Sequence, residues 1–87
     1  MSEYRAAEHV RWAVETAGVV LIDGATGTAT TLGYPRAAIW DFLTRGEPEE
    51  QICAKLCAIA RCDSATAQAL VRETMTALRE AGLVTRG

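Results

Sequence analysis

The residues of this chain that could most readily do chemistry are three cysteines. Cys53, Cys57 and Cys62 have a C-x3-C-x4-C spacing, which differs from the C-x3-C-x2-C spacing of radical iron–sulfur enzymes. Cys53 and Cys57 fall one helical turn apart, but the chain supplies no convincing set of four ligands around them for a metal. Small thiols that pack as apolar side chains explain these residues better. The sequence therefore predicts neither a metal site nor a cofactor.

Catalysis by side chains is equally poorly supported. His9 is the only histidine, and it stands far from any plausible nucleophile in a stretch expected to be exposed. No Ser-His-Asp or Cys-His arrangement can be completed from these residues. Nothing resembles a phosphate-binding loop. We therefore expect a protein that is not an enzyme.

A β-hairpin predicted over residues 17–33 offers backbone N–H and C=O groups that could form hydrogen bonds with a partner. Its first strand is the apolar run Val19–Ile22, and the turn-rich segment 23–27, with Asp23-Gly24 and Gly27, follows it. Its second strand, residues 28–32, is rich in threonine and has no charge, which is typical of a sheet edge. An edge strand exposes N–H and C=O groups that are either protected or used. We interpret this edge as used, although a solvated edge is the plain alternative.

The remaining chain provides the elements that would position this edge. Val10–Glu15 alternates in polarity, which predicts a half-buried strand with Val10, Trp12 and Val14 on one side. Helices are predicted from Pro35 to Thr44, from Pro48 onward, and after an N-cap at Asp63-Ser64. The fold class is therefore α+β and resembles a winged helix-turn-helix, with a three-stranded antiparallel sheet followed by three helices. Residues 1–9 are expected to be flexible and residues 10–87 to form one domain.

Charge and composition narrow the class of partner. Eleven acidic against nine basic residues give a net charge of −2, which argues against binding to nucleic acid. No apolar run approaches the ~18–20 residues of a transmembrane helix, so no membrane partner is expected. The odd number of cysteines suggests free thiols, and we expect a cytoplasmic protein.

Several short patterns occur together in an order that resembles the PqqD-like family of peptide-recognition domains. They are G-V-V-L-I-D (Gly18–Asp23), T-G at 26–27, Leu32, A-A-I-W-D-F-L at 37–43, Gly46 before an acidic helix start, and V-R-E-T-M-T-A-L-R-E-A-G-L-V at 71–84. The resemblance covers about residues 10–84. The chain departs from the family pattern at three places. Gly33 stands where asparagine is frequent, and the third strand is made of Thr and Ala where aromatic residues are frequent. Glu47 stands where Ser or Thr usually caps a helix.

The resemblance implies a RiPP recognition element that binds the leader segment of a ribosomally made precursor peptide. The leader would add a strand to the third strand of the sheet, lie against the third helix, and be presented to a modifying enzyme such as a radical SAM enzyme or a leader peptidase. Carried onto this chain, the implied peptide-binding residues are Thr28, Ala29, Thr30, Thr31, Leu32, Val71, Arg72, Met75, Thr76 and Arg79.

Plainer interpretations stay open for these residues. Arg72 and Arg79 could belong to a solvated face of mixed charge, since Glu73 and Glu80 adjoin them. The same order of elements would also suit a winged-helix DNA-binding protein whose third helix enters the major groove. A structural or dimerising adaptor, in which two copies pair through their free edges as a homodimer, is the third possibility.

Overall fold

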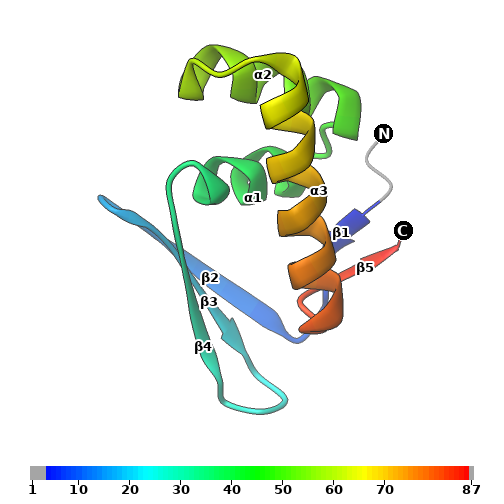
Figure 1. The fold of residues 1–87 in the computed structure, drawn as a ribbon. Helices are drawn as coiled ribbons and strands as arrows, with labels where there is room; N and C mark the ends of the chain where they lie inside the picture. Colours follow the sequence, from blue (N-terminus) through cyan, green and yellow to red (C-terminus); the bar gives the residue numbers. More distant parts are fainter. Residues whose placement is uncertain (1–3, 87) are drawn as a thin grey trace.

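A three-stranded antiparallel sheet precedes three helices in the computed structural model, which describes residues 4–86 (Figure 1). The strands are β2 (Val10–Glu15), β3 (Gly18–Asp23) and β4 (Ala29–Gly33), in the spatial order β2-β3-β4. Gly18 must be glycine, since a Cβ there would lie 2.0 Å from the Leu32 carbonyl oxygen. The predicted fold class is confirmed, with β4 shifted by one residue from the predicted strand.

The helices are α1 (Arg36–Thr44), α2 (Glu49–Ala60) and α3 (Ser64–Glu80). Pro35 is the N-cap of α1, and Gly46 adopts a positive φ of 82° after that helix. Asp63 caps α3 as predicted by accepting a hydrogen bond from the Thr66 backbone N–H at 2.8 Å. This contact with Thr66 lowers the pKa of the Asp63 carboxyl. None of the helices in residues 4–86 is both long and apolar enough to cross a membrane.

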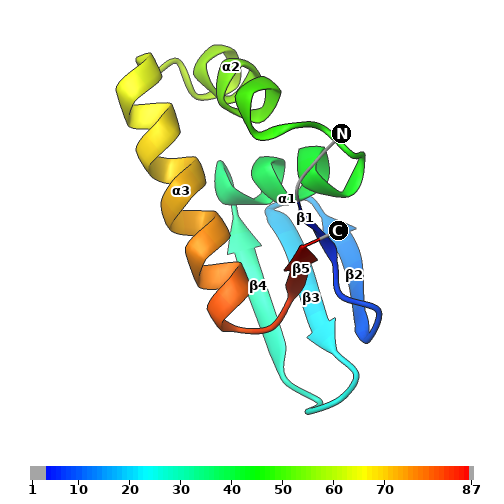
Figure 2. The ribbon, with the colours of Figure 1, turned by 90° about the vertical axis from the view of Figure 1, so that its right-hand side faces the viewer.

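The three helices lie toward one face of the sheet and share one core with it. Figure 2 shows α3 running beside β4, whereas β2 lies at the far edge of the sheet. The core combines residues from the sheet, the helices and the two terminal segments; these are Ala7, Val10, Val19, Leu21, Ala37, Ile39, Trp40, Leu43, Ile52, Leu56, Ala67, Val71, Met75, Leu78, Leu83 and Val84. Within the three-stranded sheet, β4 is therefore the strand on the side of α3.

Part of the N-terminal segment forms regular structure. Tyr4–Ala6 forms strand β1, which pairs antiparallel with β5 (Val84–Arg86). Ala7 is buried, and its N–H donates to the Leu83 carbonyl at 3.0 Å. Segments from the two ends of the sequence therefore satisfy each other's backbone groups. The first three residues of the stretch expected to be flexible lie outside the described residues.

The burial predicted for β2 is also only partly right. Val10 is 1% exposed, but Trp12 is 41% and Val14 70% exposed. The end of the sheet where β2 connects to β3 reaches beyond the helices, so they do not cover it fully (Figure 1). The alternation of polar and apolar residues therefore predicted the strand correctly. The burial predicted for its apolar side is right for Val10 but wrong for Val14.

Candidate functional site

The outer edge of β4 has no neighbouring strand within residues 4–86. The Asp23 N–H donates to the Thr28 carbonyl at 2.9 Å, and β3 and β4 continue in register from that pair. In an antiparallel ladder, alternate residues bond to the neighbouring strand. The N–H and C=O groups of Thr30 and Leu32 therefore point toward β3. Those of Ala29, Thr31 and Gly33 point outward, where another strand could pair with them.

A groove lies between β4 and α3, on the helical side of the sheet. Its volume is about 250 Å³. Residues from β4, α1, α3 and the segment after α3 line it; they are Thr30, Leu32, Arg36, Glu73, Thr74, Ala77, Leu78, Ala81 and Leu83. Most of this lining is apolar, so the groove suits an apolar side chain. An added strand on β4 would direct alternate side chains into it.

Two features mark the walls of the groove. Arg36 Nη2 lies 4.0 Å from Glu73 Oε2, so an exposed ion pair links the first turn of α1 to α3. The Thr74 hydroxyl is buried and has no hydrogen-bond partner among the described residues. A buried hydroxyl without a partner is costly in an otherwise apolar wall.

The groove continues toward the β3–β4 turn into a smaller hollow of about 200 Å³. Thr30, Ala81 and Leu83 line both spaces. The remaining lining of this second space, here the turn-end hollow, is polar and comes from Asp23, Thr26 and Thr28. The groove therefore changes from apolar to polar along the length of β4.

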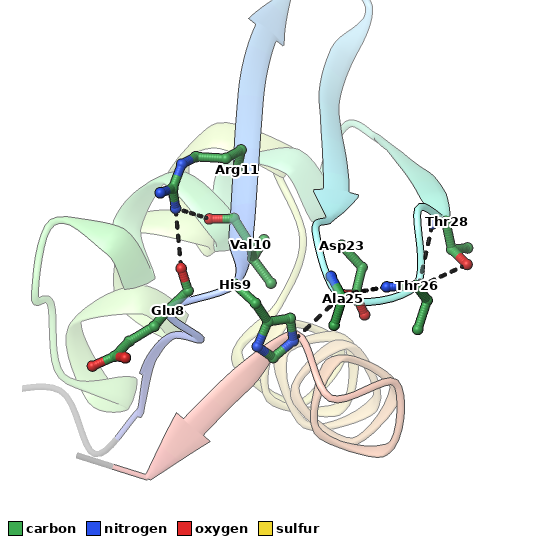
Figure 3. Close-up of polar contacts among 8 residues, drawn as sticks. All are labelled: Glu8, His9, Val10, Arg11, Asp23, Ala25, Thr26 and Thr28. Atoms are coloured by element: carbon green, nitrogen blue, oxygen red, sulfur yellow. Dashed lines mark hydrogen bonds and ion pairs between the residues drawn. The ribbon is translucent and has the colours of Figure 1, made fainter.

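Asp23 organises the turn that ends this hollow (Figure 3). Its Oδ1 accepts hydrogen bonds from the N–H groups of Ala25 at 2.8 Å and Thr26 at 3.3 Å. His9 Nε2 lies 3.6 Å from the same oxygen, and the Gly24 N–H donates to the His9 carbonyl at 2.7 Å. The hairpin turn is thereby tied to the segment before β2. These contacts hold β4 in place at its N-terminal end.

The structure brings together only part of the predicted site. Thr30 and Leu32 line the groove, Thr28 lines the turn-end hollow, and Ala29 and Thr31 carry the outward backbone groups. The five predicted α3 residues do not line the groove. Val71 is 0% and Met75 8% exposed in the core.

The other three predicted α3 residues lie away from β4. Arg72 lines a space between α2 and α3, Thr76 is half-buried outside the groove lining, and Arg79 donates to the Tyr4 hydroxyl at 3.2 Å. The helix face toward β4 instead carries Glu73, Thr74, Ala77 and Leu78, and the C-cap residue Ala81 continues it, which follows the i, i+4 spacing of a single helix face. That spacing was visible in the sequence, but it did not show which face turns toward β4.

The cysteines lie in a different part of the molecule. Cys53 and Cys57 line the space of about 360 Å³ between α2 and α3, together with Arg72. Burial raises the pKa of the Cys53 thiol, and Glu49 and Cys57 raise it further, against a lowering by Arg72. A raised pKa keeps the thiol protonated and weakly nucleophilic. Within residues 4–86, no group of three or more potential metal ligands comes together.

The chain resembles known proteins over most of its length. A family model described as coenzyme PQQ synthesis protein D (PqqD) matches residues 18–84. The solved structure of TbiB1 in complex with the TbiA(beta) leader peptide has 29% sequence identity to this chain and a TM-score of 0.87, covering 92% of this chain and 93% of that one. No curated protein sequence matches the chain.

A second solved structure, lasso peptide synthetase B1 complexed with the leader peptide, has 24% identity and a TM-score of 0.88. That alignment covers 97% of this chain and 99% of the other. At this identity the likeness concerns the fold. Both solved chains thus share the present architecture over nearly their whole length.

Proposed function

The chain belongs to the PqqD family, and from this premise we propose that it binds the leader segment of a ribosomally made precursor peptide. The leader adds a fourth strand to the sheet beside β4 and lies in the groove against α3. Main-chain hydrogen bonds supply affinity in this mode, and the groove selects alternate side chains. The bound peptide is presented to a separate modifying enzyme, such as a radical SAM enzyme or a leader peptidase.

The observation that carries this proposal is the vacant edge of β4 directly beside an apolar groove. The outward groups of Ala29, Thr31 and Gly33 provide the ladder, and Leu32, Ala77 and Leu78 provide the apolar contact. The similarity to TbiB1, a chain solved in complex with a leader peptide, supports leader binding by this fold. The proposed contact residues are accordingly Thr74, Ala77 and Leu78 on α3 and Ala81 at its C-cap.

The protein acts in this proposal as a binding partner and not as the catalyst. The raised pKa of Cys53 supports this role, as does the fact that the cysteine-lined space shares no lining residue with the groove beside β4. Three free cysteines agree with a reducing compartment, which supports a cytoplasmic location. No comparison favours the DNA-binding alternative. A homodimer through β4 would compete with the leader for the same backbone groups.

Titration calorimetry tests the proposal. The full chain is titrated with the leader of the precursor peptide encoded beside its gene, and a scrambled peptide of the same composition serves as control. We expect a dissociation constant of about 10 μM or tighter for the leader, equivalent to about 7 kcal/mol, and no binding of the scrambled peptide. A folded protein that does not bind the leader would overturn the proposal.

A further inference from the structure

Asp23 is a carboxylate at the end of the groove, where it lines the turn-end hollow in addition to holding the hairpin turn. Asp23 as a whole is only 8% exposed, but part of it lines the turn-end hollow. The N–H groups of Ala25 and Thr26 and the His9 imidazole all contact the same oxygen of Asp23, Oδ1. His9, with a side chain 42% exposed, is the one basic group within ion-pair distance of Asp23 in the described chain. The hollow therefore presents negative charge in a partly desolvated place.

The sheet register sets which part of an added strand could reach this carboxylate. Asp23 on β3 lies opposite Thr28, and their side chains share the helical face with Leu21 and Thr30. A strand added to β4 would place one groove-facing residue beside Thr28. Its backbone would lie two strand spacings from that of Asp23, roughly 10 Å. Only a long side chain spans that distance.

Building on the leader-binding function, we propose that the leader carries a lysine or arginine at the groove-facing position beside Thr28, where its charge meets Asp23. The aliphatic stem crosses Thr28 and Thr30, and the charged group reaches the hollow. The leader residues beside Thr30 and Leu32 are apolar, because they face Ala77, Leu78 and Leu83. The recognised pattern is therefore two apolar residues and one cation at alternate positions of a strand.

A double comparison tests this pattern. Each position of the synthetic leader's strand is changed in turn to lysine and to norleucine, which match in length but differ in charge. Both series are titrated into the wild-type protein and into Asp23→Asn. Asparagine retains an oxygen that can accept the N–H groups of Ala25 and Thr26, so the turn should persist. Asp41→Asn, a carboxylate on α1 that pairs with Arg45, is the matched control.

We expect one strand position at which the wild-type protein prefers lysine by about tenfold, as for a partly buried charged hydrogen bond. Asp23→Asn should remove that preference, whereas Asp41→Asn should keep it. The preference should also fall with added salt in the wild-type protein, a readout that does not depend on the variant folding.

The outcomes separate the two proposals. A wild-type protein that binds the leader without preferring lysine at any position overturns the Asp23 assignment and leaves the leader-binding function intact. A lysine preference that survives in folded Asp23→Asn overturns the assignment as well. Absence of any binding by the unmodified leader overturns both.

Discussion

Ala77 is a small residue in the lining of the groove between β4 and α3. It is exposed, lies on the face of α3 toward β4, and lines the groove beside Leu78. Its small side chain leaves space that a leader side chain would occupy.

We predict that Ala77→Phe weakens leader binding by about tenfold, or about 1.4 kcal/mol, because the ring fills this space. Ala69→Phe is the control, since Ala69 is also an exposed alanine on α3 but lies outside the groove lining. Titration and thermal melting of both variants check the prediction. Equal affinity of the two folded variants would show that the leader does not use this groove.

Residue types identified the strand side of the candidate site but not its helix side. Thr30 and Leu32 could be predicted because an uncharged threonine-rich strand beside a turn indicates an edge. The helix residues depend on the rotation of α3 about its axis. That rotation is set by packing of Val71 and Met75 into the core, and a sequence pattern does not specify which flank of a buried stripe meets β4.

At the scale of the element, β4 combines two different sets of backbone groups. Alternate residues bond to β3, and those between them, including Thr31, face outward. A proline in an edge strand can remove an outward N–H while leaving the ladder to the neighbouring strand in place.

We predict that Thr31→Pro leaves the protein folded but weakens leader binding by about tenfold, since one ladder hydrogen bond is lost and the edge is distorted. Val14→Pro is the matched control, because the register places Val14 as an outward residue of the opposite edge strand, β2. Circular dichroism and titration give the two readouts. Tight binding by folded Thr31→Pro would argue against strand addition at this edge.

The elements themselves were predictable where a local signal existed. The Asp63 cap, the glycine after α1 and the alternation in β2 each identify a boundary or a type of structure. Strands β1 and β5 had no such signal. Their pairing joins residues about 80 positions apart, as in Tyr4 with Arg86, and it depends on how the helices bring the two ends together.

At the scale of the molecule, the two edges of the sheet have different surroundings. β4 lies beside α3 and the groove, whereas β2 carries Trp12 and Val14 at an exposed end. Trp12 packs edge-on against Trp40 with ring centroids 5.3 Å apart. A leader bound at β4 leaves the β2 edge accessible, so the proposed complex has a face left for other contacts.

Amide hydrogen exchange, measured residue by residue by NMR with and without the leader, tests strand addition at β4 most directly. We predict that the leader slows exchange at Ala29, Thr31 and Gly33, whose N–H groups point outward. Thr30 and Leu32 should be protected already in the free protein. Unchanged exchange at those three amides on saturation with the leader, or new protection along β2 instead, would contradict this prediction.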